Sequence, residues 1–256
     1  LMVPRIFPLK IGRGEMRKFL ITFFAFFVGL FPVLSDARAD GLDLDTSDPL
    51  YMLSEQHVLS ETTLTYWDNV LRLGQELSYG INSRLTIAAN VHFQQDFDGP
   101  EDGFSAVDLG GVYRVGTAGG NSAHIISDVL FGLKVGGSSH VRTPDFADST
   151  YYAGYRFGRQ WAGMTLAATI KSSWIFDDER GMAFIDATPE AYFRIAPDWR
   201  LGAQFTLRKA TNPHYNQEWL GGKIIRQYGR TQYAAHLDYE FESDDLQVGV
   251  NVNVLF

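Results

Sequence analysis

The last eleven residues of the chain alternate between apolar and polar side chains. Leu246 to Phe256 reads Leu-Gln-Val-Gly-Val-Asn-Val-Asn-Val-Leu-Phe, with an apolar residue at every even position. Successive side chains of a β-strand point to opposite faces of its sheet. The pattern therefore predicts a strand with one apolar face and one polar face.

The same alternation recurs through the chain from about residue 55. It is weak in the first run, ambiguous in phase in Trp219–Tyr228, and interrupted by Pro189, because proline removes a ladder donor. About twelve strands are expected, at Glu55–Tyr66, Leu71–Tyr79, Leu85–Phe93, Val107–Val115, Ala123–Val135, Tyr151–Phe157, Met164–Phe176, Ala183–Ile195, Trp199–Leu207, Trp219–Tyr228, Tyr233–Phe241 and Leu246–Phe256. Short turns are expected at Gly80–Ser83, Thr117–Asn121, Gly158–Gly163, Ala196–Asp198 and Gly229–Arg230, and they alternate with longer polar loops.

The C-terminal strand resembles the final strand of bacterial outer-membrane β-barrel proteins, which alternates in the same way and ends on an aromatic residue such as Phe256. The resemblance implies an all-β fold, a closed antiparallel transmembrane barrel with an up-and-down meander, in the outer membrane of a Gram-negative bacterium. It also implies that Phe256 takes part in a signal read by the barrel-assembly machinery. Outer-membrane lipids would then surround the barrel.

Alternation alone does not say whether the apolar faces meet lipid or a core, because a soluble sandwich also alternates. Three features favour lipid. Amphipathic runs account for nearly all the strands, the polar faces carry charges in mid-strand, and aromatic residues lie at run ends, as at a bilayer interface. A sheet in lipid must close, because every backbone group has to pair internally. A periplasmic or secreted β-protein is the alternative.

The first forty residues have the features of an export signal. Arg17 and Lys18 precede an apolar run over residues 19–34, and the small residues Ala37 and Ala39 follow. Residues 16–39 are therefore expected to be a signal peptide cleaved after Ala39, with residues 1–15 as upstream sequence read in frame. An N-terminal membrane anchor is the alternative, since about 20 apolar residues span a bilayer. Residues 40–54 are expected to form a periplasmic lead-in to a barrel over residues 55–256.

Composition excludes several kinds of site and several classes of protein. The chain has no Cys, which excludes disulfides and Cys-based metal sites. The first 39 residues hold six of the 22 Lys and Arg but only two of the 30 Asp and Glu, so the rest of the chain is strongly acidic. An acidic body argues against nucleic-acid binding, which needs a basic surface. A hydrophobic fraction of 45% is ordinary for a soluble protein, so a membrane protein of this composition is not a helical one.

If the polar faces point inward, charges of both signs line the barrel. The expected lumen residues are the basic Arg72, Arg84, Arg114, Lys134, Arg156, Lys171, Arg194, Arg200 and Arg208, and the acidic Glu76, Asp108, Asp128, Asp186, Glu190, Asp238 and Glu240. Mixed signs in a narrow space indicate ion pairs, because an unpaired charge there is costly. A charged constriction would select solutes by sign and size. The alternative is an ion-paired interior that only fills the barrel; twelve strands lie between filled eight-stranded barrels and sixteen-stranded porins.

Enzymes also occur on this scaffold. An outer-membrane phospholipase or lipid A deacylase would place a His beside a Ser on the lipid face. By strand phase His92, His124 and His236 face the lumen, while His140 and His214 lie in loops. The chain has no HExxH or G-x-S-x-G motif and no metal-ligand spacing, so no catalytic residue, metal or cofactor is expected. The acidic run Asp177–Glu179 is expected to be solvated, although acid pairs at the barrel rim stay open.

These observations favour a passive porin-like channel for small hydrophilic solutes, with selectivity set by Arg, Asp and Glu of the lumen. A hydrolase acting on lipid or peptide at the barrel rim is one alternative. A structural barrel without transport is the other.

Overall fold

The computed structural model describes residues 45–256, except for 121–122, 138–145, 147, 177–181 and 213–214. The expected signal peptide, the acidic run Asp177–Glu179 and the loop residues His140 and His214 lie outside the described residues. Within the described ranges, no helix has the length and apolar character needed to cross a membrane.

The described chain is almost entirely strand. Twelve long strands and the two-residue strand β4 follow one another as β1 (Val58–Trp67), β2 (Val70–Asn82), β3 (Leu85–Asp96), β4 (Gly103–Phe104), β5 (Val107–Gly120), β6 (Ala123–Val135), β7 (Thr150–Trp161), β8 (Met164–Ile175), β9 (Ala183–Ala196), β10 (Trp199–Ala210), β11 (Gln217–Tyr228), β12 (Thr231–Glu240) and β13 (Asp245–Leu255).

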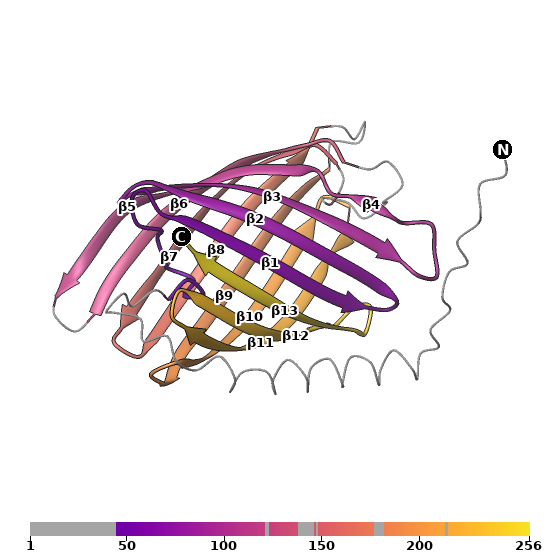
Figure 1. Cartoon of the computed structure of the whole chain (residues 1–256). Helices are drawn as coiled ribbons and strands as arrows, with labels where there is room; N and C mark the ends of the chain where they lie inside the picture. The colour runs from indigo at the N-terminus through magenta and orange to yellow at the C-terminus, as the bar shows by residue number, and fades with distance from the viewer. Residues whose placement is uncertain (1–44, 121–122, 138–145, 147, 177–181, 213–214) are drawn as a thin grey trace. The chain divides into compact units, whose positions relative to one another are not determined.

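The sheet closes on itself. Each long strand pairs antiparallel with the next one along the chain, and β1 pairs with both β2 and β13. Thr62 of β1, for example, lies opposite Gln75 of β2 and Val252 of β13. Figure 1 shows β1 and β13 side by side where the two ends of the barrel wall meet. The predicted closed antiparallel barrel with an up-and-down meander is confirmed.

The apolar face of each strand lies on the outside of the barrel. The exposed large side chains follow the predicted phase and include Leu73, Leu77, Ile87, Leu109, Val129, Phe131, Leu133, Leu166, Ile170, Ile185 and Leu237. Aromatic side chains gather toward the strand ends, as at Tyr79, Phe93, Tyr151 and Phe241, although Tyr113 lies in the middle of β5. A water-soluble protein would not expose so large an apolar surface, whereas a bilayer covers it.

Several strands are longer than predicted, and the turns at one end of the barrel are correspondingly shorter. The connections at this end, hereafter the short-turn end, are two residues long at 83–84, 162–163, 197–198 and 229–230. The stretches Thr117–Asn121 and Gly158–Gly163, predicted as turns, are mostly strand. Gly158, for instance, pairs with Ile126 and Ala167. The glycines there allow close strand contact rather than a turn, because a Cβ at Gly158 would overlap the Leu166 carbonyl oxygen.

The structure explains the two runs in which the alternation is unclear or interrupted, Trp219–Tyr228 and the run that contains Pro189. In β11, Ile225 lies opposite the buried Arg200 and is itself buried, while its neighbour Ile224 is exposed, so this strand carries apolar residues on both faces. In β9, the ladder to β10 lacks partners for Thr188 and Pro189 but resumes on either side. Proline therefore interrupts the pairing locally without ending the strand.

The outward face of β8 gives a direct test of this orientation. Ile170 lies in mid-strand and is 51% exposed, and Thr169 beside it points inward. We expect Ile170→Lys to destabilise the barrel by about 2–4 kcal/mol in lipid vesicles, because it places a charge at the bilayer midplane. Urea unfolding measures the effect, with Thr169→Lys as the lumen-facing control. Equal costs for the two variants would contradict the assignment of faces.

Candidate functional site

The lumen is lined by most of the charged side chains predicted to lie there. The inward positions, all buried or half-buried, hold Arg72, Glu76, Asp108, Arg114, Asp128, Lys134, Arg156, Lys171, Asp186, Glu190, Arg200, Arg208, Asp238 and Glu240. Each follows from the strand alternation, since a residue between two outward apolar side chains points inward. The lumen is therefore the candidate functional site.

Two predicted residues are exposed at the short-turn end, and one of them, Arg194, lies opposite the inward Arg200 on the same face of the sheet. Arg84 belongs to the two-residue turn between β2 and β3 and is exposed, and its carbonyl oxygen accepts a hydrogen bond from the backbone N–H of Arg114 at 2.7 Å. Arg194 is exposed near the short-turn end of β9. Arg84 directly precedes the first residue of β3, and its place in the lumen stays a prediction.

A buried ion cluster crosses β5, β6 and β7. Asp128 of β6 is fully buried and accepts hydrogen bonds from Arg114 on β5, at 2.9 Å from Nε, and from Arg156 on β7, at 2.7 Å from Nη2. Two guanidinium groups thus share one carboxylate. The cluster satisfies the buried acid and leaves one net positive charge on this wall.

A second cluster of the same kind crosses β8, β9 and β10. Asp186 of β9 lies 2.7 Å from the Nε of Arg208 on β10 and 3.6 Å from the Nζ of Lys171 on β8. Again two cations share one carboxylate, and this wall too carries a net positive charge.

The carboxylates of β1, β2 and β12 have neutral donors instead. Glu61 of β1 accepts a hydrogen bond from the Asn251 amide at 3.0 Å, and Glu76 of β2 accepts one from the Ser78 hydroxyl at 2.9 Å. Asp238 of β12 accepts one from the Gln204 amide at 3.2 Å. Neutral donors hold these carboxylates in place without cancelling their charge.

The segment Asp45–Leu53, hereafter the N-terminal segment, lies against lumen-facing side chains at the short-turn end. Asp45 pairs with Arg200, which is 1% exposed, at 2.8 Å and accepts a hydrogen bond from the Tyr192 hydroxyl. Asp48 accepts hydrogen bonds from Thr165 and from the Gln160 amide. Residues 40–54 were expected to form a periplasmic lead-in, and the described part makes polar contacts with the inside of the wall.

Apolar contacts reinforce this attachment. Leu50 is 1% exposed and packs against Ile126 and Ala167, while its carbonyl oxygen accepts a hydrogen bond from Arg114 at 2.7 Å. Leu53 packs against Leu255 near the end of β13. Burial of Tyr51 in the same segment raises the pKa of its phenol. The N-terminal segment therefore narrows the short-turn end of the lumen.

The described residues line at least three cavities along the lumen. The outer cavity, about 490 Å³, is at the end with the longer loops and is lined by Trp67, Trp219, Arg72, Lys134 and Glu240 among others. The central cavity, about 320 Å³, is lined by Glu61, Gln204, Lys223, His236, Asp238 and Asn251. The inner cavity, about 300 Å³, lies between the N-terminal segment and the wall and is lined by Glu61, Glu76, Arg156 and Lys223 among others.

Arg72 is held at the outer cavity by aromatic rings. Its guanidinium carbon lies 4.6 Å from the ring centroid of Trp67 and 4.3 Å from that of Phe146, a buried residue of the loop between β6 and β7. Cation–π contacts of this kind stabilise a charge that is partly removed from water. They also fix where this cation sits at the mouth of the lumen.

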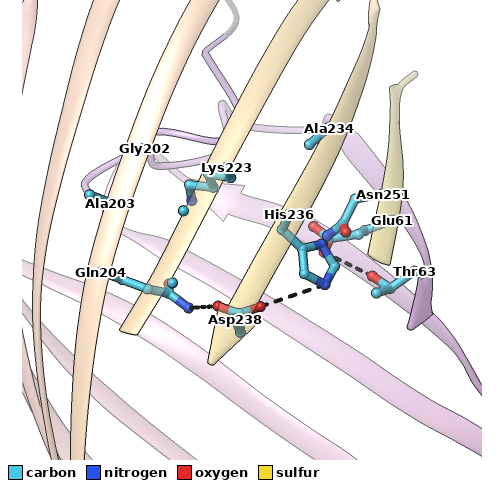
Figure 2. Close-up of a pocket in the computed structure, with 12 residues that line it drawn as sticks. Glu61, Thr63, Gly202, Ala203, Gln204, Lys223, Ala234, His236, Asp238 and Asn251 are labelled. Atoms are coloured by element: carbon cyan, nitrogen blue, oxygen red, sulfur yellow. Dashed lines mark hydrogen bonds and ion pairs between the residues drawn. The ribbon is translucent and has the colours of Figure 1, made fainter. Parts of the chain in front are cut away.

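The central cavity holds an acid–histidine pair. Figure 2 shows Asp238 between Gln204 and His236, with its carboxylate oxygen 3.8 Å from the Nε2 of His236. The two residues are two positions apart on β12 and therefore share the lumen face. In the part of the chain that the structure describes, no group of three or more His, Asp or Glu side chains is arranged to hold a metal ion.

Glycines let the larger lumen side chains lie flat along the wall. His92, Tyr152, Lys223, Asp238 and His236 each lie over a glycine directly opposite on a neighbouring strand, in that order Gly74, Gly132, Gly202, Gly221 and Gly249. A Cβ at any of these glycines would overlap the side chain above it. The arrangement keeps large polar groups against the wall and out of the middle of the lumen.

Sequence reasoning missed Glu61, Lys223, Asp45 and Asp48. Glu61 lies on β1, where both faces carry polar residues, and Lys223 lies on β11, where both faces carry apolar ones. In neither strand does the alternation fix the face. Asp45 and Asp48 lie before the first strand and contact residues more than 100 positions away, which no local pattern can indicate.

The barrel is similar to solved outer-membrane channels at low sequence identity. The KdgM porin gives a TM-score of 0.59 at 12% identity over 77% of this chain and 98% of that chain, and was also solved in complex with disordered oligogalacturonate. The NanC porin gives 0.57 at 9% over 76% and 98%. The COG4313 outer membrane channel from Pseudomonas putida F1 gives 0.56 at 9% over 86% and 100%.

No protein-family model matches the chain, and no curated protein matches it. At such low identities the similarity establishes the fold, a closed β-barrel of the outer-membrane kind.

Two adjacent glycines of β11 test the role of the flat side chains. A Cβ at Gly221 would overlap the Asp238 carboxylate, whereas a Cβ at Gly222 would meet nothing within 4 Å. We expect Gly221→Ala to push Asp238 away from the wall and lower the single-channel conductance of the refolded protein. Gly222→Ala should leave the conductance unchanged. Equal effects of the two variants would show that the space over Gly221 does not influence the conductance.

The anchor of the N-terminal segment gives a second test. Asp45→Ala removes the carboxylate that Arg200 and Tyr192 share, at a cost of about 1–3 kcal/mol for buried donors that lose a partner. We expect the segment to detach from the wall and the single-channel conductance to rise. Glu55→Ala, at an exposed position beyond the segment, is the control. An unchanged conductance in Asp45→Ala would mean that the segment does not restrict the pore.

Proposed function

We propose that the chain forms a passive channel for small hydrophilic solutes in the outer membrane of a Gram-negative bacterium. The observation that carries the proposal is the lumen itself, in which charged side chains line three successive cavities inside a wall that is apolar on its outer face. Such a lumen offers water and hydrophilic solutes a path that the surrounding bilayer does not.

Charges of the lumen would set the selectivity. Arg114 and Arg156 with Asp128, and Lys171 and Arg208 with Asp186, place positive charge on one wall, while Glu61, Glu76 and Asp238 carry the opposite sign. Oligogalacturonate, the ligand in one KdgM porin structure, is itself a hydrophilic solute. The fold similarity to that porin supports a channel function. The kind of solute that this chain would pass has to be inferred from the charges and the volume of its own lumen.

Export and assembly belong to the same proposal. The signal peptide at residues 16–39 would direct the chain to the periplasm, where the C-terminal strand with Phe256 would engage the barrel-assembly machinery. Phe256 is 63% exposed beyond the end of β13, which supports a role in contacts outside the barrel wall. The short-turn end would face the periplasm and the longer loops the outside, as in other outer-membrane barrels.

A hydrolase is the second candidate function, and one observation favours it. His236 and Asp238 form an acid–histidine pair, which is a common device for activating water or a hydroxyl. The pair lies in the central cavity and not at the barrel rim, so a substrate would have to enter the lumen to reach it. A hydrolase acting at the barrel rim, as expected from the sequence, would carry its pair at the rim, and we therefore favour the channel.

Ion preference tests the role of the β5–β7 cluster. Purified protein in a planar bilayer should give discrete ion-conducting steps, and Arg114→Ala combined with Arg156→Ala should shift the preference toward cations, because Asp128 would lose both guanidinium groups. The reversal potential in a KCl gradient measures the shift. Arg159→Ala with Arg230→Ala removes the same charge at two exposed positions, one opposite the outward Leu166 and one in the turn between β11 and β12, and is the control.

Three outcomes separate the possibilities. Conducting steps with a shifted preference support the channel and the role of the cluster. Steps with an unchanged preference would remove Arg114 and Arg156 from the selectivity site, provided that heat-modifiable gel migration shows a folded barrel. A folded barrel without conductance would contradict the channel proposal and leave the hydrolase and the structural barrel.

A further inference from the structure

Of the inward residues named above, cations outnumber carboxylates on β5 to β11, and carboxylates outnumber cations on β12, β1 and β2. The first group contains the carboxylates Asp108, Asp128, Asp186 and Glu190, and the second contains the cation Arg72. Inward cations gather on the contiguous strands β5 to β11, where they include Arg114, Lys134, Arg156, Lys171, Arg200, Arg208 and Lys223. Inward carboxylates with neutral donors gather on β12, β1 and β2, where they include Glu61, Glu76, Asp238 and Glu240. The closed sheet makes both groups contiguous walls of one lumen.

The two walls face one another across the inner cavity. Glu61 and Glu76 come from β1 and β2, while Arg156 comes from β7, on a different part of the closed wall, and all three line the same cavity together with Lys223 of β11. Asp48 of the N-terminal segment also lines this cavity, where the Gln160 amide and the Thr165 hydroxyl donate to it. Walls with opposite excess charge around a space of about 300 Å³ create an electric field with a component across the lumen.

Hydrogen bonding within each wall preserves its excess of charge. Arg156 shares Asp128 with Arg114, so the pair of guanidinium groups exceeds its acid by one charge. Lys223 lies over Gly202, and its Nζ is 3.5 Å from the Ser47 carbonyl oxygen of the N-terminal segment. On the other side, the Asn251 amide and the Ser78 hydroxyl hold Glu61 and Glu76.

We propose that the inner cavity binds small zwitterionic solutes, with the carboxylate of the solute at Arg156 and Lys223 and its ammonium group at Glu61 and Glu76. The proposal rests on the channel function and names its substrate class. A molecule with both charges gains at both walls, whereas an ion of either sign is attracted to one wall and repelled by the other. A neutral molecule has no favourable charge–charge interaction with either wall.

The volume of the cavity limits the size of the solute. At about 30 Å³ for each water molecule, the inner cavity holds roughly ten waters. A free amino acid or a similarly small zwitterion fits this space, and an extended oligosaccharide does not.

Four solutes of similar size and different charge test the proposal. They are β-alanine as the zwitterion, propionamide as the neutral molecule, propionate as the anion and propylammonium as the cation. Each is added to the full mature protein in a planar bilayer at moderate salt, and the concentration that halves the ion current is measured. We expect β-alanine to halve the ion current at a concentration roughly fivefold lower than either ion requires, because one additional pair of opposite charges about 4 Å apart in water contributes about this factor. Propionamide should require a much higher concentration than β-alanine.

Variants of the two walls identify the site. Glu61→Gln with Glu76→Gln should raise the half-blocking concentration of β-alanine roughly fivefold and leave that of propionate unchanged or lower, because the ammonium site is lost. Lys223→Gln should raise the values for β-alanine and propionate alike. Glu218→Gln and Lys209→Gln change the exposed ion pair between β10 and β11 and should change neither value.

The results separate a failure of this inference from a failure of the channel itself. Steps of ion current with equal sensitivity to all four solutes, or with a β-alanine response that survives Glu61→Gln with Glu76→Gln, would overturn the zwitterion site and leave the channel intact. A folded barrel that passes no current would overturn both. Selective block by β-alanine that these substitutions abolish supports the site.

Discussion

Pairing of every backbone N–H and C=O within the sheet is the constraint on which the rest of this structure depends. Hydrocarbon offers no water to an unpaired peptide group, so a sheet in a bilayer must have no free edge. Strand β1 meets this requirement by pairing with β2 on one side and β13 on the other. Hydrogen bonds between Val58 and Phe256 continue the seam past the end of β13. The first and last strands of the barrel are thereby joined.

A closed wall fixes the position of each inward side chain, and this makes the interior chemistry specific. Asp128 can serve two arginines because β5, β6 and β7 hold Arg114 and Arg156 in register on either side of it. Asp186 serves Lys171 and Arg208 in the same way. Glycines opposite the largest polar side chains keep these groups against the wall. The excess of cations on one wall and of carboxylates on the other is therefore fixed by the strand register, and the N-terminal segment adds the floor of the inner cavity.

How far the sequence predicts this structure depends on the contrast between the two faces of each strand. In β13 only apolar residues point outward and nearly all inward residues are polar, so the face of Asn251 follows from the alternation alone. In β1 both faces are polar, and in β11 Trp219 and Ile225 point inward, so Glu61 and Lys223 acquire their orientation only through pairing with neighbouring strands. The attachment of Asp45 to Arg200 depends on tertiary contact and has no local signal.

The orientation of the strand faces can be measured directly because the chain contains no native cysteine. Single cysteines are placed along β13 of the membrane-inserted protein, at Gln247 and Asn251 on one face and at Val248, Val250 and Val252 on the other. Each is then treated with a charged, water-soluble thiol reagent. An aqueous lumen predicts rapid labelling at the two odd positions and little at the even ones. Uniform labelling, or faster labelling at the valine positions, would contradict a barrel whose polar faces enclose water.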